Sequence, residues 1–153
     1  MLLSYLGITG NYKLRLLVNT KHNPISDCIM YTKSLLDLVV TAFETIGFVT
    51  HHPMQILKHP LADSRLSYIL TRVESKSEYI GVIVCDWKRI VGIGQICKTE
   101  ELLHACPELN QVLIISSMGF SRAALLIAEK RRKIGLISKK ELISLMLKHL
   151  EIS

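Results

Sequence analysis

The sequence predicts an α/β domain in which helices flank a central mixed β-sheet. Three observations lead to this expectation. Two short β-branched runs, at residues 80–85 (IGVIVC) and 111–116 (QVLIIS), are typical of buried strands. An alternating segment at 65–73 precedes the first run across a polar turn at 74–78, as in an antiparallel hairpin. Strand and helix patterns then alternate toward the C-terminus, which is the order of a sheet with parallel strands.

Composition limits the class of protein. The chain has 153 residues, of which 49% are hydrophobic and 21% charged, as in a globular domain with a hydrophobic core. We therefore predict a single domain over residues 1–153. No apolar run approaches the roughly 18–20 residues that span a bilayer, and no basic leader precedes the first apolar run. We expect a cytoplasmic protein with no membrane partner. The net charge of +6 suits either an anionic partner or simply a basic surface.

The spacing of cysteine, histidine and glycine argues against several kinds of site. The four cysteines and six histidines show no metal-ligand spacing, so we expect no zinc site. The pair Gly92-x-Gly94 lacks the rest of a dinucleotide-binding fingerprint, so we expect no nucleotide cofactor. Three cysteines are flanked by apolar residues and are predicted to be buried reduced thiols: Cys28, Cys85 and Cys106.

The first part of the chain is predicted to contain a strand and a long helix. Residues 13–18 (KLRLLV) are the strand candidate. A helix is expected to begin at a cap formed by Ser26-Asp27 and to end at Gly47, because glycine commonly follows the last helical residue. Its apolar positions recur at helical spacing and are Ile29, Leu35, Leu36, Val39, Val40, Phe43 and Ile46.

Shorter elements follow this helix. Residues 48–57 are predicted to form an edge strand interrupted by Pro53, which cannot donate to a sheet ladder, and residues 58–62 a loop. The run KRRK at 130–133 is either a solvated helix end or a contact with a DNA backbone. The elements expected after the hairpin are a turn at 89–94, a helix at 98–106 with Thr99 near its cap, a strand at 111–116, a helix from Ser121 to about residue 131, a strand at 134–137 and a helix at 139–150 capped by Ser138.

The tripeptide Asp86-Trp87-Lys88 directly follows the buried run at 80–85. Side chains alternate between the two faces along a strand, so Asp86 and Lys88 point the same way and Trp87 points the other way. The sequence therefore predicts a carboxylate and an ammonium group side by side at the end of a buried strand.

The predicted hairpin brings Asp63 to the same place. If its turn centres near Lys76, Lys88 lies opposite Ser64, with Asp63 beside that pair. Two convergent carboxylates can hold Mg²⁺, which takes oxygen ligands and keeps several waters. A nearby lysine can stabilise negative charge that develops on a phosphate group. The structural alternative is a simple ion pair at a strand end.

Three stretches of the chain follow one another in a recognisable order. They are a helix that ends in Gly47-Phe48, then Asp63 with a hairpin leading to Asp86-Trp87-Lys88-Arg89, and then 112–128 (VLIISSMGFSRAALLIA) followed by 134–137 (IGLI) and Glu141-Leu142. In this order the sequence resembles the restriction-endonuclease-like, or PD-(D/E)xK, nucleases. Among these it is most similar to the Mrr-type catalytic domains and the archaeal Holliday-junction resolvases. The resemblance covers about residues 26–150.

This resemblance implies a restriction-endonuclease-like core and a Mg²⁺-dependent DNA endonuclease, with Mn²⁺ as a possible substitute. Asp63 and Asp86 would be the metal ligands, Lys88 the catalytic lysine and Arg89 a contact to a backbone phosphate. Nucleases of this class often act as homodimers. Residues 1–23 lie outside the resemblance and would be an N-terminal extension or a dimer arm.

A position in the first helix keeps a second function open. Members of the family often carry a glutamate there, and the corresponding residue in this chain is Leu36, beside Asp37 and two turns before Glu44. Either acid would serve as a ligand or would be an ordinary solvated helix charge. The alternative function is therefore a catalytically inactive DNA-binding or assembly module on the same fold.

Overall fold

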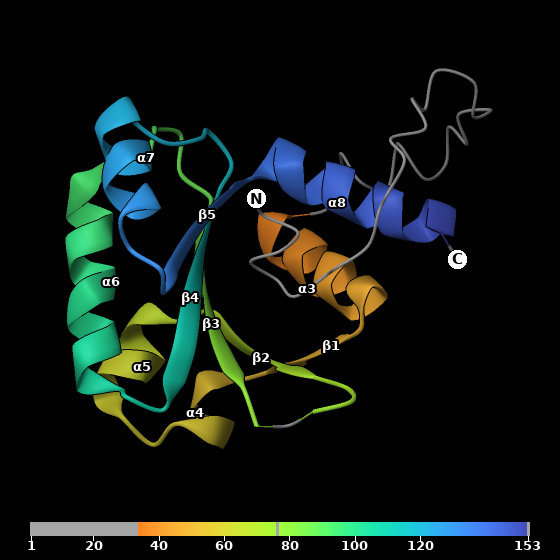
Figure 1. Cartoon of the computed structure of the whole chain (residues 1–153), viewed down its shortest axis with the longest axis horizontal. Coiled ribbons are helices and arrows are strands. Elements are labelled where there is room, and N and C mark those ends of the chain that lie inside the picture. The colour runs from red at the N-terminus through yellow and green to blue at the C-terminus, as the bar shows by residue number, and fades with distance from the viewer. Residues whose placement is uncertain (1–33, 76, 153) are drawn as a thin grey trace. The chain divides into compact units, whose positions relative to one another are not determined.

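The computed structural model describes residues 34–75 and 77–152, and these form a five-stranded mixed sheet between two layers of helices (Figure 1). The strands lie in the order β1-β2-β3-β4-β5. The pairs β1–β2 and β2–β3 are antiparallel, whereas β3–β4 and β4–β5 are parallel, which confirms the predicted mixed sheet. The strands are β1 (Phe48–His51), β2 (Tyr68–Arg72), β3 (Tyr79–Cys85), β4 (Leu109–Ser116) and β5 (Ile134–Ser138).

Helices cover both faces of the sheet. Helices α6 and α7 pack together on one face, with α5 against α6, while α3 and α8 pack together on the other face (Figure 1). Residues 112–115 of β4 are fully buried between the two layers. No described helix is long and apolar enough to cross a membrane. The helices are α3 (Leu35–Ile46), α4 (Pro53–Ile56), α5 (Pro60–Arg65), α6 (Ile93–Ala105), α7 (Arg122–Glu129) and α8 (Lys139–Ile152).

Helix α3 has well-defined ends. The Ser34 hydroxyl accepts a hydrogen bond from the Asp37 amide at 3.2 Å, and Gly47 ends the helix with a left-handed φ of 108°. The predicted end at Gly47 is confirmed, but Leu36 is exposed rather than buried. The predicted cap at residues 26–27 and the strand at 13–18 lie outside the described residues. The side chains that α3 buries are Leu35, Leu38, Val39, Ala42 and Phe43.

Replacement of Gly47 with alanine is expected to lower the free energy of unfolding by about 1 kcal/mol, because a Cβ disfavours the left-handed conformation. The matched control is Gly94→Ala in the first turn of α6. An added Cβ there meets no atom within 4 Å, and φ is not left-handed. Alanine at that position should raise stability by up to about 1 kcal/mol through helix propensity. Urea denaturation measures both changes, and effects of the same sign would contradict this account of Gly47.

Two short helices replace the predicted strand end and loop at residues 52–62. β1 lies at the edge of the sheet, as Pro53 suggested, but it ends at His51. In both helices a histidine precedes a proline at the first helical position, where its missing N–H group costs nothing. The Nδ1 atom of His52 accepts from the Met54 amide at 3.3 Å. His59 does the same for the Leu61 amide at 3.1 Å.

The C-terminal half follows the predicted order with one boundary displaced. Helix α6 begins at Ile93, five residues earlier than expected, within the region predicted as a turn. Thr99 is consequently buried inside the helix rather than at its cap, and its hydroxyl donates to the Gln95 carbonyl at 2.8 Å. The predicted caps at Ser121 and Ser138 are confirmed, since their hydroxyl oxygens accept from amides three residues later at 3.1 and 3.2 Å.

Candidate active site

The exit of β3, the middle strand of the sheet, carries the predicted tripeptide. Cys85 is the last residue of β3 and is paired with Ser116 of β4. Asp86 and Lys88 are exposed, whereas Trp87 is half-buried and packs against the core, as the alternation predicted. Among the described residues, Asp86 and Lys88 have neither a hydrogen-bond partner nor an ion-pair partner. The carboxylate and the ammonium group are therefore presented to solvent.

Two neighbouring connections hold this exit in place, and we call residues 86–92 and 117–121 the paired loops. The Ser117 hydroxyl donates to the Trp87 carbonyl at 3.0 Å, and the Ser117 amide donates to the Cys85 carbonyl at 3.3 Å. Further along, the Val91 amide donates to the Gly119 carbonyl at 3.0 Å. These bonds join the segment that carries Asp86 and Lys88 to the segment that follows β4.

Arg89 lies over the ring of Trp87, with its guanidinium carbon 4.8 Å from the ring centroid. At this distance a cation–π interaction holds the guanidinium group against the half-buried indole. Arg89 also lies near Cys85. Burial raises the pKa of the Cys85 thiol to about 11, while Arg89 acts in the opposite direction. Burial likewise raises the pKa of Cys106. Cys85 and Cys106 are free and buried, as predicted, and their thiols stay protonated at neutral pH, whereas Cys28 lies outside the described residues.

Asp63 does not lie on the hairpin. It is an exposed residue of α5, and its amide donates to the His59 carbonyl at 3.1 Å. In the ladder Tyr68 pairs with Val82 and Leu70 with Ile80, two residues away from the predicted register. The predicted pairing of Lys88 with Ser64 is therefore wrong, because the chain at Ser64 is helical and β2 begins only at Tyr68. The hairpin argument for bringing Asp63 beside Lys88 no longer applies.

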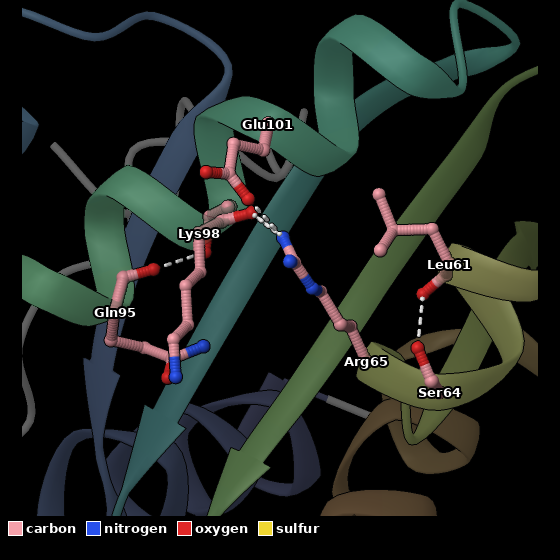
Figure 2. Close-up of polar contacts among 7 residues, drawn as sticks. Leu61, Ser64, Arg65, Gln95, Lys98 and Glu101 are labelled. Atoms are coloured by element: carbon pink, nitrogen blue, oxygen red, sulfur yellow. Dashed lines mark hydrogen bonds and ion pairs between the residues drawn. The ribbon is translucent and has the colours of Figure 1, made fainter.

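Helix α5 is attached to α6 and to the middle of β3. Arg65 reaches across to α6, where its Nη1 atom donates to the Lys98 carbonyl at 2.7 Å and to the Glu101 carboxylate at 2.9 Å (Figure 2). The end of α5 packs over Gly81, since a Cβ at this glycine would lie 2.9 Å from Leu66 Cδ2. Gly81 precedes Cys85, the last residue of β3, by four residues, or about 13 Å of extended chain. The contact between α5 and β3 therefore lies about 13 Å of chain before the exit of the strand.

On the β2 side of β3 the chain presents the hydroxyl group of Ser67 and not the carboxylate that the hairpin predicted, Asp63. Ser67 immediately precedes β2, and its amide donates to the Val82 carbonyl at 2.8 Å. Its hydroxyl oxygen accepts from the Val84 amide at 3.1 Å. The side chain thereby continues the pairing of β2 with β3 toward the exit. Nothing in the sequence distinguished this serine from other polar residues, because its role depends on the ladder register.

The acids of α3 are engaged locally. Asp37 accepts a hydrogen bond from the Ser34 hydroxyl at 2.8 Å, and Glu44 accepts one from the Thr50 hydroxyl at 3.0 Å. Neither contact involves the exit of β3. Both acids therefore act as parts of the helix cap and of the α3–β1 connection.

The basic run at 130–133 lies at the opposite end of the parallel strands from Asp86. It precedes β5, which runs parallel to β4 and β3, whereas Asp86 follows β3. Within this run Arg131 forms an ion pair with Glu100 of α6. The run and the exit of β3 therefore cannot contact the same phosphate group.

The donor chemistry of the exit suits a hard cation in part. Mg²⁺ is commonly held by one or two carboxylates together with waters and substrate phosphate oxygens. The exposed Asp86 carboxylate fits that requirement. Within residues 34–75 and 77–152, however, no three acidic, histidine or cysteine side chains gather in a group able to hold a metal ion.

Comparison with known families identifies the domain. A profile of the Mrr_cat family, described as a restriction endonuclease, matches residues 30–146. The chain belongs to the Mrr_cat restriction endonuclease family. This confirms the predicted resemblance to the restriction-endonuclease-like superfamily. No curated protein sequence matches it significantly.

A solved structure shows the same fold. The Mrr_cat chain is similar to a crystal structure of AF1548, described as a protein of unknown function, with a TM-score of 0.59 and 18% sequence identity. The match covers 76% of this chain and 65% of the AF1548 chain. At this identity the likeness concerns the fold alone. The mixed sheet with helices on both faces is the restriction-endonuclease-like fold that the sequence predicted.

Proposed function

We propose that the domain is a metal-dependent DNA endonuclease that hydrolyses phosphodiester bonds at the exit of β3. The observation that supports this proposal is the exposed pair Asp86 and Lys88, which have no partner among the described residues, at the end of the middle strand of a Mrr_cat domain. A carboxylate and an ammonium group without partners leave both charges available to a cation and a phosphate group.

Each side chain has a distinct proposed role. The Asp86 carboxylate is a metal ligand, and Lys88 stabilises the negative charge that develops on the phosphate oxygens in the transition state. Arg89, held over Trp87, contacts a neighbouring backbone phosphate. When bound, Mg²⁺ or Mn²⁺ would polarise the scissile phosphate and help to generate hydroxide from water. Asp63 is the second proposed ligand, on the family pattern alone.

The direct test is incubation of the full chain with plasmid, single-stranded and four-way-junction DNA in the presence of Mg²⁺, Mn²⁺ or EDTA. We expect nicking with either metal and none with EDTA. The three DNA forms also show which substrate is preferred. Absence of cleavage for every form and metal would reject the endonuclease. Light scattering of the same samples tests whether the chain forms a homodimer, which we propose because nucleases of this class often act as homodimers.

A catalytically inactive DNA-binding or assembly module is the second candidate. Three observations favour it: Ser67 occupies the β2 side of β3, Asp63 lies on α5, and the described residues contain no group of three acidic, histidine or cysteine ligands. A complete site would need oxygen ligands in addition to Asp86. Binding of DNA without cleavage under any metal condition would establish this second function.

A further inference from the structure

Two large apolar side chains project from the paired loops. Ile90 is 57% exposed and Met118 is 56% exposed. Each is followed closely by a residue that faces inward, since Val91 is fully buried and Phe120 packs against the core. Val91 and Phe120 therefore anchor the loops to the core, while Ile90 and Met118 face solvent.

The backbone beneath these side chains is fixed. Val91 and Phe120 form a parallel bridge, in which the Val91 amide donates to the Gly119 carbonyl at 3.0 Å and the Ser121 amide donates to the Val91 carbonyl at 2.9 Å. Gly119 has a left-handed φ of 87°, and its carbonyl also accepts from the Ser116 hydroxyl at 2.8 Å. The connections after β3 and β4 therefore form one unit at the top of the sheet (Figure 1).

The surroundings of this unit are basic. The last paired residues of β3, β4 and β5 are Cys85, Ser116 and Ser138, so the segments that follow them share one edge of the sheet. The positively charged residues at that edge attract phosphate groups. An apolar protein surface that covered them would remove their water without offering a negatively charged partner. The charged residues of this edge are five cations, Lys88, Arg89, Arg122, Lys139 and Lys140, against two acids, Asp86 and Glu141.

We propose that the paired loops act as a wedge that inserts Ile90 and Met118 against unstacked bases of DNA, while the cations around them bind the flanking phosphates. This inference rests on the proposed function and names the form of DNA that the site prefers. Apolar side chains gain nothing from phosphates but are buried when they contact base faces, as in proteins that place isoleucine or methionine between base steps.

The wedge predicts a preference for DNA that is already distorted. Insertion into a continuous duplex requires a base step to be unstacked, which opposes binding. A bulge of unpaired nucleotides offers base faces that are already accessible. The hydrogen bonds at Val91 and Gly119 favour such a site, because they hold the two loops together and so keep Ile90 and Met118 on one structural unit.

The test compares a labelled duplex with the same duplex carrying a bulge, by fluorescence anisotropy with the full chain. Ca²⁺, which also takes oxygen ligands, replaces Mg²⁺. We expect the parent to bind the bulged form about tenfold more tightly. The double variant Ile90→Ser, Met118→Ser should bind the bulged form less than about twofold more tightly than the duplex. The matched control is Val73→Ser, 62% exposed beside the β2–β3 turn at the other end of the hairpin, which should behave as the parent does.

Several outcomes would overturn the wedge. A parent that binds both forms equally, or a folded double variant that retains the full preference, would reject it and leave the proposed nuclease intact. A double variant that changes the oligomeric state in light scattering would assign the two side chains to contacts between copies of the chain. A parent that binds neither DNA form would reject the proposed function itself and the wedge with it. Circular dichroism melting shows whether the double variant is folded.

Discussion

Replacement of Asp86 with alanine is expected to abolish metal-dependent nicking while DNA binding is retained or becomes tighter. The variant loses the proposed metal ligand at the exit of β3, so the rate should fall at least roughly a hundredfold, which is about 2.7 kcal/mol of barrier. It also loses a negative charge beside the phosphate backbone, so affinity should not decrease. Single-turnover cleavage and anisotropy on the same DNA measure the two effects.

The matched control for Asp86→Ala is Glu108→Ala. Glu108 is an exposed acid that immediately precedes β4, at the opposite edge of the sheet, and its removal changes the net charge by the same amount. This control should cleave as the parent does. If Asp86→Ala nicks DNA as fast as the parent, the chemistry takes place at another site or in a contaminating nuclease. Asp63→Ala, measured in parallel, shows whether α5 supplies a ligand.

Buried strands and helix caps could be predicted because each depends on local chemistry. The β-branched runs that became β3 and β4 have few alternatives to a buried sheet. Ser121 and Ser138 satisfy helix amides through their own side chains, and Gly47 adopts a conformation that other residues avoid. These features do not depend on residues far away in the sequence.

Helices α4 and α5 were missed because they are too short to show helical periodicity. α5 has six residues, fewer than two full turns. The available signal was the repeated His-Pro pair, at His52-Pro53 and His59-Pro60, in which proline marks the first helical position. Histidine is not among the usual capping residues, so the sequence pattern at these positions predicts a strand end and a loop.

The hairpin register was missed for a different reason. Strand side chains alternate with a period of two, so a shift of two residues keeps every side chain on its own face. The apolar pattern therefore cannot distinguish the predicted ladder from the observed pairing of Tyr68 with Val82. The orientation of Trp87 toward the core, away from Asp86 and Lys88, depends only on alternation and was predicted. The position of Asp63 depends on the register and on α5, and it was not.

Lys88→Ala separates an enzyme from a binding module. A lysine that acts on the transition state affects the rate more than the affinity. We expect single-turnover cleavage to fall at least roughly tenfold, which is about 1.4 kcal/mol of barrier. DNA affinity should change little, because one lost phosphate contact alters the salt dependence of binding by only about one unit of slope.

The matched control for Lys88→Ala is Lys133→Ala, since Lys133 is an exposed lysine immediately before β5 at the opposite edge of the sheet. It removes the same charge far from the exit of β3, so single-turnover cleavage should stay near the parent value, and a loss of affinity would assign the run at 130–133 to the DNA backbone. If Lys88→Ala instead loses most of its DNA affinity, and the parent cleaves no DNA form with any metal, Lys88 is a binding residue. The exposed pair at the end of β3 then serves DNA recognition, and the inactive module replaces the nuclease as the function of this domain.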